Sequence, residues 1–481
     1  MKLITVLALP LVLAAAAAGA GLYYLQSEGV TPRALAPYIL KRTAGHNSLI
    51  EGAGRFSAAT LLRLDRGTIA PYVPPALVLG AQPDRRDASA ISPAGNERLV
   101  GTSDEAWRVI DSAEAGDVIT LLPGDYALRR TVYARNPGRA TAPIVVRAAR
   151  PGTVHITVDT REGFAVAAPY WRFENLDMQG VCSNHSSCEH AFHVTGDAHH
   201  FIARNNTLRD FNAHFKINGV NGRFPDYGLI ESNTLNNSAP RQTPFPVTPI
   251  DLVGASDWTM RANLIQDFIK AEGDRVSYGV FAKGGAERTV FERNVVLCEA
   301  LLTGQPGQRV GLSFGGGGTG KPYCRDRRCI TEHDGGTMRA NLIAGCSDVG
   351  IYLNSAAAAR LVDNTLLDTA GVQVRFPTSS ATLEGNLIDG PLREDEGGII
   401  RGQDNLSTAI SWLYLGRHPQ RGLFADPARL DLGWRSGQAR RPGADGGPPS
   451  RQEGQVDLCG ASGGARHAYG AFDDFAACLR H

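Results

Sequence analysis

The sequence predicts an all-β fold, a single-stranded parallel β-helix in which short strands stack coil upon coil. Four short runs of one shape carry this prediction: HVTG at 193–196, KING at 216–219, DLVG at 251–254 and FAKG at 281–284. Each run is followed by an asparagine, and the steps between these residues are 27, 30 and 31 positions for Asn206, Asn233, Asn263 and Asn294. A period of this size, built from strand-like pieces, is typical of a solenoid.

The pattern continues to about residue 405, with LSFG at 312–315, YLNS at 352–355 and VRFP at 374–377 followed by Asn341, Asn364 and Asn386. One insertion, 316–336, leaves the coil and returns to it. An asparagine at the same turn of every coil predicts a ladder of side-chain amide bonds along the axis. We therefore assign these asparagines a structural role and no catalytic one.

Composition agrees with a β-rich chain that has many turns. The chain has 481 residues, 43% of them hydrophobic, with 55 glycines and only 7% aromatic residues. The formal net charge is +1, which gives no support to a nucleic-acid partner. We expect a monomer.

The N-terminus predicts export. Residues 3–25 carry no charge and follow Lys2, and their terminal position argues against a buried core helix. The stretch is longer than the hydrophobic region of a usual signal peptide and long enough to span a bilayer. The AGA at 18–20 fits a signal-peptidase cleavage site. A cleaved signal peptide and a retained anchor both stay open for residues 1–25. We expect the protein at the periplasmic face of the membrane or in the cell envelope, anchored or secreted, with membrane contact through this segment only.

Eight cysteines fit an exported chain and predict four disulfides. Three pairs are close in sequence: Cys182 with Cys188, Cys324 with Cys329, and Cys459 with Cys478. Cys298 and Cys346 each follow a ladder asparagine by four or five residues, so we expect them on neighbouring coils and within bonding distance. Metal binding is the alternative, but no CxxC pair or histidine-rich spacing supports it.

The other segments extend or cap the β-helix. In 26–100 we expect a helical stalk and linker, because helical periodicity there ends at Pro71, Pro74 and Pro75. From Thr102, TSDEAWRVIDSAEAGD predicts a short helix that caps the first coil. We assign 101–405 to the β-helix and 406–481 to a closing coil with a disulfide-stapled tail.

Alternation of side chains along a strand predicts which residues leave the coil. The columns through Phe192 and Val194 should point inwards. One outward column should hold His193, Lys216, Asp251, Phe281, Leu312 and Tyr352, and the other Thr195, Asn218, Val253, Lys283, Phe314 and Asn354. This polar stripe either holds an extended polymer or is an ordinary solvated face. If it binds substrate, the expected contacts are Asp251, Asn218, Tyr352, Phe281 and Phe314.

The stripe also suggests a chemistry. Elimination at a uronic acid needs a base, a cation that neutralises the carboxylate, and an acid for the leaving oxygen. Lys283 is the candidate base, because Phe281, Val253 and Phe314 should desolvate it and lower its pKa. Lys216, His193 and Arg309 are the candidates that assist. A glycosidase needs two facing carboxylates, and Asp251 has no evident partner, so we rank that reaction lowest.

Residues 101–405 resemble the pectate-lyase-like superfamily of right-handed parallel β-helices, above all the chondroitinase-B-like and alginate-lyase-like enzymes of polysaccharide lyase family six. The resemblance rests on AGDVITLLPGDYAL with TAPIVVRAARPG after it, on VFAKGGAERTVFERN at 280–294, and on LFADPARLDLGWRSGQA at 423–439. It implies that Lys283 is the catalytic lysine of a lyase that acts on an acidic polysaccharide.

The chain departs from this family at two places. The family's catalytic arginine belongs in the run LSFGGGG, which has none here, and Arg309 lies nearby. The family's calcium ligands precede the lysine, where this chain reads VSYGV without a carboxylate. We therefore expect no metal or cofactor; calcium stays open as the alternative, although the family's ligand positions are not matched. The sequence predicts an exported β-helix that binds an acidic polysaccharide and cleaves it by β-elimination. The alternative is a non-catalytic β-helix that binds a polymer or packs in the envelope.

Overall fold

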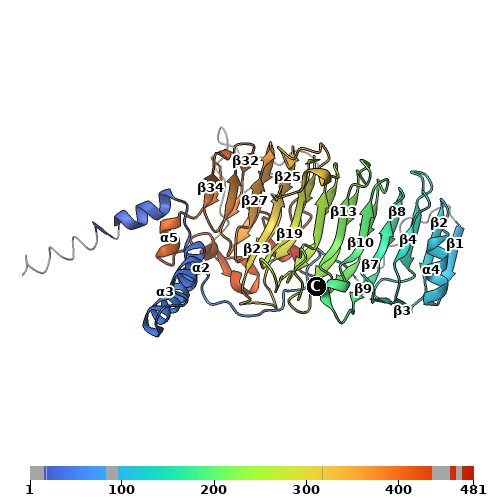
Figure 1. Cartoon of the computed structure of the whole chain (residues 1–481), viewed down its shortest axis with the longest axis horizontal. Coiled ribbons are helices and arrows are strands. Elements are labelled where there is room, and N and C mark those ends of the chain that lie inside the picture. The colour runs from blue at the N-terminus through green and yellow to red at the C-terminus, as the bar shows by residue number, and fades with distance from the viewer. Residues whose placement is uncertain are drawn as a thin grey trace, which may run out of the picture.

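The computed structural model describes residues 16–17, 19–82, 96–316, 318–402, 404–435, 456–461 and 468–480. It confirms the predicted fold, a right-handed parallel β-helix (Figure 1). Most of the predicted export segment lies outside the described residues. Among the helices that are described, none has both the length and the apolar character needed to cross a membrane.

Within the described residues, three long parallel sheets run the length of the solenoid. The ten-stranded sheet contains β4 (Val132–Ala134), β7 (Glu162–Val166), β10 (His190–Thr195), β13 (Ala213–Asn218), β16 (Ile250–Val253), β19 (Val276–Lys283), β23 (Gln308–Phe314), β27 (Ile351–Asn354), β31 (Val372–Arg375) and β34 (Leu392–Asp395). Each coil passes from this sheet to the twelve-stranded sheet and then to the eleven-stranded sheet.

The twelve-stranded sheet contains β1 (Asn96–Val100), β2 (Asp117–Leu121), β5 (Ile144–Ala148), β8 (Trp171–Glu174), β11 (Ile202–Arg204), β14 (Leu229–Glu231), β17 (Thr259–Arg261), β21 (Val290–Glu292), β25 (Thr337–Arg339), β29 (Ala359–Val362), β32 (Ser380–Glu384) and β35 (Ile399–Arg401). The eleven-stranded sheet contains β3 (Gly124–Leu128), β6 (Val154–Val158), β9 (Asp177–Gly180), β12 (Thr207–Arg209), β15 (Thr234–Asn236), β18 (Leu264–Gln266), β22 (Val295–Leu297), β26 (Leu342–Ala344), β30 (Thr365–Leu367), β33 (Leu387–Ile388) and β36 (Leu406–Ser407).

The interior is a stack of apolar side chains, one layer per coil. Phe192 stacks on Phe164 at 5.4 Å and on Phe215 at 5.2 Å between ring centroids. At the first coils, α4 (Ser103–Asp111) closes the stack, because its buried Trp107 packs edge-on against Phe164 at 5.9 Å. The Thr102 side chain accepts a hydrogen bond from the Glu105 amide and so caps the helix. This confirms the predicted capping helix.

The predicted asparagine ladder is present and fully buried over most of its length. In the middle of the ladder, Asn263 Oδ1 accepts from Asn233 Nδ2 at 3.1 Å and from the Asn233 backbone amide at 2.9 Å. Asn263 Nδ2 in turn donates to Asn294 Oδ1 at 3.0 Å and to the Ile230 carbonyl at 2.9 Å. The same bonds repeat from Asn206 to Asn405.

The ladder turns are tight because the residue before each asparagine is left-handed. The φ angles are 56° at Asn205, 55° at Ser232 and 55° at Ala262. This conformation costs a residue with a side chain about 1–2 kcal/mol. The amide bonds of the next residue offset that cost, so ladder and turn form one unit.

One part of the predicted register is wrong. Leu312 pairs with Val280 and Ile351, where Gly311 was expected, so β23 is displaced by one residue. Phe314 therefore points into the coil, fully buried against Phe291 at 4.9 Å and His333 at 4.0 Å between ring centroids. Ser313 takes the outward position between Phe281 and Tyr352. The repeat pattern of the sequence places Gly315, the first glycine after Phe314, opposite Gly284 of the preceding coil. In the structure Phe314 pairs with Ala282, so the glycines after it are shifted by one residue.

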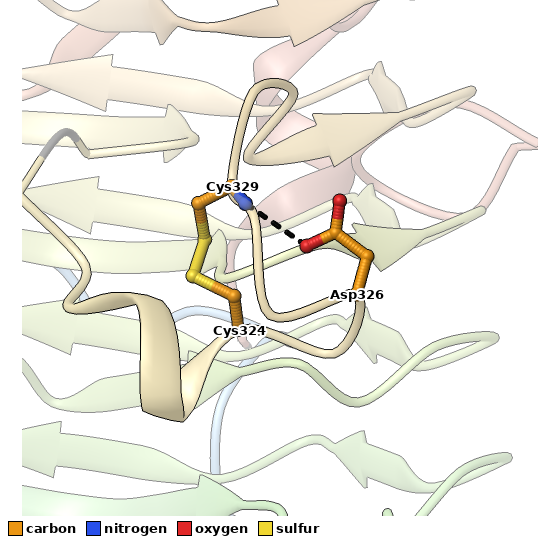
Figure 2. Close-up of side chains that lie close together, drawn as sticks. All are labelled: Cys324, Asp326 and Cys329. Atoms are coloured by element: carbon orange, nitrogen blue, oxygen red, sulfur yellow. Dashed lines mark hydrogen bonds between the residues drawn. A yellow bond between two sulfur atoms is a disulfide. The ribbon is translucent and has the colours of Figure 1, made fainter.

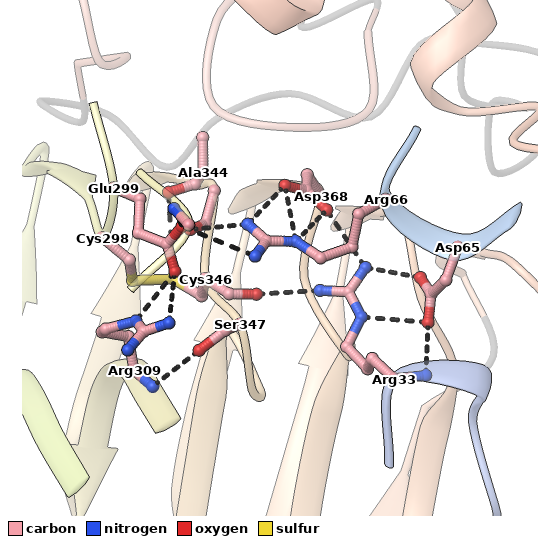
Figure 3. A network of polar contacts seen from close by, with 12 residues as sticks. Arg33, Asp65, Arg66, Cys298, Glu299, Arg309, Ala344, Cys346, Ser347 and Asp368 are labelled. Atoms are coloured by element: carbon pink, nitrogen blue, oxygen red, sulfur yellow. Dashed lines mark hydrogen bonds and ion pairs between the residues drawn. A yellow bond between two sulfur atoms is a disulfide. The ribbon is translucent and has the colours of Figure 1, made fainter. Parts of the chain in front are cut away.

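The N-terminal helices lie against the last coils of the solenoid, far from α4 (Figure 1). They are α2 (Pro32–Thr43) and α3 (Ser48–Arg66), which form an antiparallel hairpin. Buried ion pairs hold this hairpin in place (Figure 3). Arg33 pairs with Asp65 at 2.5 Å and with Asp368 at 3.1 Å, and it donates to the Cys346 carbonyl at 2.8 Å. Arg66 pairs with Asp368 at 2.8 Å.

The chain then runs back along the solenoid and the C-terminal segments cover it. Leu77, Leu79, Phe424 and Phe472 form a second apolar core with outward side chains of the eleven-stranded sheet. The C-terminal segments include α5 (Ile410–Tyr414) and the antiparallel pair of β37 (Phe424–Asp426) and β38 (Asp431–Trp434). The four predicted disulfides are confirmed: Cys182–Cys188, Cys298–Cys346, Cys324–Cys329 and Cys459–Cys478.

We expect Asn263→Ala to lower the free energy of unfolding by about 3 kcal/mol, because it leaves several buried amide and carbonyl groups without partners at about 1–3 kcal/mol each. Urea denaturation followed by circular dichroism measures this. Asn405→Ala is the matched control, since Asn405 ends the ladder and is only partly buried. Equal losses in the two variants would contradict a ladder whose strength lies in its buried middle.

Candidate functional site

The predicted stripe lies on the outer face of the ten-stranded sheet. The register pairs His193 with Lys216, Lys216 with Asp251 and Asp251 with Phe281, so these residues form one column on neighbouring strands. Asn218 and Lys283 lie in the adjacent outward column, where Val253 separates them. The structure thus brings together the predicted stripe residues of strands β10 to β19.

Within this stripe, most polar side chains already bind one another. Lys216 Nζ donates to Asp251 Oδ1 at 2.8 Å. His193 lies between Glu162, at 3.0 Å from Nδ1, and Asn218, at 2.9 Å from Nε2. The hydrogen bond with His193 lowers the pKa of Glu162 despite its partial burial. Glu162 was missed in the sequence because it begins a strand one coil before the repeat pattern becomes visible.

A second histidine lies behind the stripe. The His190 ring is buried, 5.2 Å from that of His193 between centroids. Burial, and then the charges of His193 and Lys216, lower the pKa of His190 to about 3. This histidine is therefore neutral at physiological pH and contributes no charge to the face.

Lys283 differs from the other cations of the stripe. Its Nζ lies 4.4 Å from the centroid of the Phe281 ring, a cation–π contact. The backbone of Gly316 covers its other side, so that a Cβ at Gly316 would lie 3.2 Å from Lys283 Cδ. Its ammonium has no hydrogen bond or ion pair with any residue that the structure describes. Phe314, expected beside Lys283, lies inside the coil instead.

The insertion that covers Lys283 is closed by the Cys324–Cys329 disulfide (Figure 2). Asp326 Oδ1 accepts from the backbone amides of Arg328 at 2.8 Å and Cys329 at 2.9 Å. These residues lie close enough to suggest a metal site, but the sulfurs form the disulfide and the carboxylate holds the turn. The cluster therefore stabilises the insertion.

The insertion also contacts the second loop expected near this face, 222–228. Arg325 forms a bidentate pair with Asp226, with both bonds at 2.8 Å, and donates to the Gly254 carbonyl at 3.0 Å. Its guanidinium also lies 4.7 Å from the centroid of the Phe224 ring. The two loops form one wall beside the strand ends that carry Asn218 and Lys283.

Arg309 is separated from the other proposed catalytic residues. It pairs with Ser277, six residues before Lys283 in β19, which places it roughly 20 Å from Lys283. Its buried guanidinium donates to Glu299 Oε1 at 2.8 Å and to the carbonyls of Gln305 at 2.7 Å and Pro306 at 3.0 Å. These bonds belong to the buried network of Figure 3.

That network borders a cavity of about 820 Å³ on the same face. Its floor is the outer side of β19, β23, β27, β31 and β34, and α2 forms a wall. The residues that line it include two tyrosines, Tyr278 and Tyr352, two carboxylates, Glu299 and Asp348, and five arginines, Arg33, Arg66, Arg309, Arg375 and Arg393. We call it the arginine cavity.

Two of these arginines have weaker or more exposed partners than the others. Arg33, Arg66 and Arg309 are buried in ion pairs with Asp65, Asp368 and Glu299. Arg393 Nε is buried without a partner among the described residues, while its Nη1 donates to the Gly29 carbonyl at 3.4 Å and lies 3.8 Å from Asp395. Arg375 pairs at 2.6 Å with Glu396, a half-exposed residue, and bonds to Tyr352. Arg393 Nε is therefore the buried donor that the cavity can offer to an anion.

The tyrosines give the cavity a flat apolar component. Tyr352 packs with Val310, Val349 and Ala370, and Tyr278 lies against this cluster. Burial and the nearby Tyr352 raise the pKa of Tyr278 to about 12, so it keeps its hydroxyl proton. Burial likewise raises the pKa of Asp348. Of the cavity, sequence reasoning found only Tyr352 and Arg309, because α2 lies hundreds of residues away in the chain.

Solved structures similar to this chain include polysaccharide lyases. The crystal structure of pectate lyase Pel9A matches with a TM-score of 0.53 and 13% identity over 81% of this chain and 100% of that one. Alginate lyase from Paenibacillus sp. str. FPU-7 matches with a TM-score of 0.36 and 17% identity over 64% of this chain and 99% of that one. The PL6 family polysaccharide lyase Pedsa3628 from Pseudopedobacter saltans matches with a TM-score of 0.35 and 12% identity over 70% of this chain and 99% of that one.

The likeness to the pectate lyase establishes a polysaccharide-lyase-like fold. A scan of protein-family models finds no match to the chain, and neither does a search of curated protein sequences.

Buried histidines predict that the protein loses stability in acid. Burial lowers the pKa of His333 to about 3 and that of His214 to about 4, from 6.5 in the unfolded chain. Between the folded-state pKa values and 6.5, the unfolded state binds more protons than the folded state. The contribution of these histidines to stability is therefore fully present above pH 6.5 and is lost as the pH falls below it. For His333 alone the loss at pH 5 is about 2 kcal/mol.

We expect His333→Phe to remove that share of the loss, because phenylalanine keeps the stack on Phe314 and does not titrate. Urea unfolding of both proteins at pH 7.5 and pH 5 measures the difference. His155→Phe is the control, since His155 is exposed. A variant whose stability declines between the two pH values as steeply as that of the wild type would rule out His333 as a source of the acid sensitivity.

Proposed function

We propose that this protein is exported and binds an acidic polysaccharide along the outer face of its ten-stranded sheet, with the arginine cavity as the principal binding site. The observation that carries the proposal is a cavity lined by five arginines, in which Arg393 Nε is buried without a partner among the described residues and which continues a polar and aromatic face. Its volume is within the range of about 300–1,000 Å³ that ligand pockets occupy.

The chemistry of a uronic acid fits these groups. A guanidinium binds a carboxylate through two parallel hydrogen bonds; Arg393 has a donor without a partner among the described residues, and the Glu396 partner of Arg375 is half-exposed. Tyrosine rings give an apolar surface for a sugar ring, with a polar edge. Gln373, which also lines the cavity, adds an amide group for hydroxyls. A uronate carboxylate could approach Arg393 more closely than Asp395 does at 3.8 Å, whereas a neutral sugar adds no charge.

Export is supported by the covalent structure. Four disulfides are typical of chains that fold in an oxidising compartment. The uncharged segment 3–25 supplies a targeting signal of the expected kind. An extended acidic polymer of the cell envelope or the surroundings is the partner that this location makes accessible.

Arg393→Gln should weaken binding to an acidic polysaccharide about tenfold, because one charge-assisted hydrogen bond contributes about 1.5–3 kcal/mol. Arg375→Gln should have a smaller effect, since Glu396 already shares that guanidinium. Isothermal titration with polygalacturonate, alginate and a neutral glucan measures the affinities, with Arg150→Gln, on an exposed arginine of an early coil, as control. Unchanged affinity in both cavity variants would exclude the cavity as the binding site.

A second candidate function is cleavage of the polymer by β-elimination, with Lys283 as base. The specific observation in its favour is that the Lys283 ammonium has no described ion-pair partner and lies between an aromatic ring and the insertion. Against it, Lys216 and Arg309 are both paired with carboxylates, so neither offers a free charge to the uronate. A non-catalytic binding protein therefore fits the described contacts better.

If the protein is a lyase, Lys283→Ala should lower the rate at least about 100-fold, the smaller end of what a general base contributes. The assay follows ultraviolet absorbance of unsaturated products from a panel of uronic acid polymers. Lys321→Ala, on the exposed insertion, is the control. Activity that survives Lys283→Ala removes this base from consideration. A wild-type protein that binds these polymers and releases no product identifies a binding protein.

A further inference from the structure

The hairpin of α2 and α3 exposes apolar side chains that no described element covers. In the first half of α3, Leu49 is 79% and Phe56 75% exposed, and Ile50 is 40% exposed. Tyr38 and Leu40 of α2 are 54% and 41% exposed. Single exposed apolar residues are ordinary, but a group on one projecting element marks an interaction surface.

Helical geometry places Leu49 and Phe56 on the outer side of α3. The face that packs on α2 carries Gly54 and Ala58, and a Cβ at Gly54 would collide with Thr43 of α2. At 3.6 residues per turn, Leu49, Ala53 and Phe56 align on the opposite face. These side chains therefore point away from the protein, and the close contact at Gly54 holds α2 and α3 together beneath them.

Exposed cations lie on the same hairpin as this apolar face. They are Lys41, Arg42, Arg55 and Arg63, of which Arg55 pairs at 3.5 Å with Glu51, the acidic residue in the first turn of α3. Arg42 lies 5.2 Å from the centroid of the Tyr38 ring. A helix with aromatic and aliphatic residues on one side and Lys or Arg beside them is the pattern of an element that lies in a membrane interface.

The position of the hairpin agrees with that pattern. Residues 19–27 form a helix that leads to α2, with Tyr23 76% and Tyr24 62% exposed. This helix and α3 project from the same end of the solenoid, away from α4 (Figure 1). The uncharged stretch 3–25 ends where this helix exposes its tyrosines. Tyrosine is enriched at the level of lipid headgroups.

We propose that the α2–α3 hairpin is a membrane-docking surface that inserts Leu49 and Phe56 into the headgroup region of an anionic bilayer. Lys41, Arg42 and Arg55 bind the lipid phosphates around it. Leu49 and Phe56 are not among the residues that line the arginine cavity, and they lie outside the N-terminal segment. Because Arg33 and Arg66 fix the hairpin to the last coils, docking holds the solenoid in one orientation at the membrane surface.

The test uses the full chain with Phe56→Trp, mixed with vesicles of phosphatidylglycerol and phosphatidylcholine that contain brominated acyl chains. We expect the added tryptophan fluorescence, taken as the difference from wild type, to fall by at least about half. Tyr323→Trp is the matched control, because Tyr323 is 73% exposed on the insertion and away from the hairpin. Circular dichroism confirms that both variants fold.

Both variants keep the N-terminal segment, so the excess of quenching at position 56 over position 323, and its dependence on the hairpin cations, measures docking and not anchoring. Lys41→Glu with Arg55→Glu should reduce the quenching severalfold, whereas Arg150→Glu, on an early coil, should not. Vesicles of phosphatidylcholine alone should quench less than anionic vesicles. Quenching at position 56 no greater than at 323, or equal quenching after charge reversal, overturns the proposal.

Discussion

The asparagine ladder is the interaction on which the rest of the structure depends. Each amide oxygen accepts both a side-chain and a backbone N–H of the preceding coil, and each amide nitrogen returns a bond to a carbonyl of that coil. These bonds hold left-handed turns at residues such as Ala262 that would otherwise be unfavourable. They also tolerate coils of different length. Asn294 bonds to Asn341 at 3.0 Å although 47 residues separate them, so the insertion leaves the coil without disturbing the stack.

A rigid stack aligns outward side chains in columns, and this determines the character of the functional face. Opposite charges that fall on adjacent strands pair, as Lys216 and Asp251 do at 2.8 Å. The early coils therefore present a largely neutralised surface. In the arginine cavity, where α2 adds a wall, Arg393 Nε is buried without a partner among the described residues. We therefore place the proposed binding site in the cavity and not on the stripe.

Local pattern was enough to predict the coils, the capping helix, the ladder and the disulfides, because each of these depends on spacing within one or two coils. Cys298 and Cys346 could be paired since both follow a ladder asparagine. The same reasoning failed at Phe314, where a glycine run matched the repeat one residue out of place. Periodicity alone does not indicate that the large ring of Phe314 fills the interior beside Phe291.

The arginine cavity could not be predicted because its walls come from distant segments. Arg33 and Asp368 are 335 residues apart in sequence. The pairing of Arg309 with Glu299 was equally hidden, since Glu299 lies in a turn whose path depends on the Cys298–Cys346 disulfide.

That separation has a consequence for how the chain is made. The hairpin that carries Arg33 and Arg66 is synthesised early, yet its carboxylate partner Asp368 follows some 300 residues later. Until the late coils have stacked, the two guanidinium groups have only water and Asp65 as partners. Burial of the hairpin therefore reports that the solenoid has reached nearly its full length. A chain truncated before Asp368 would leave these cations exposed, and exposed, poorly packed segments are what chaperones and proteases act on.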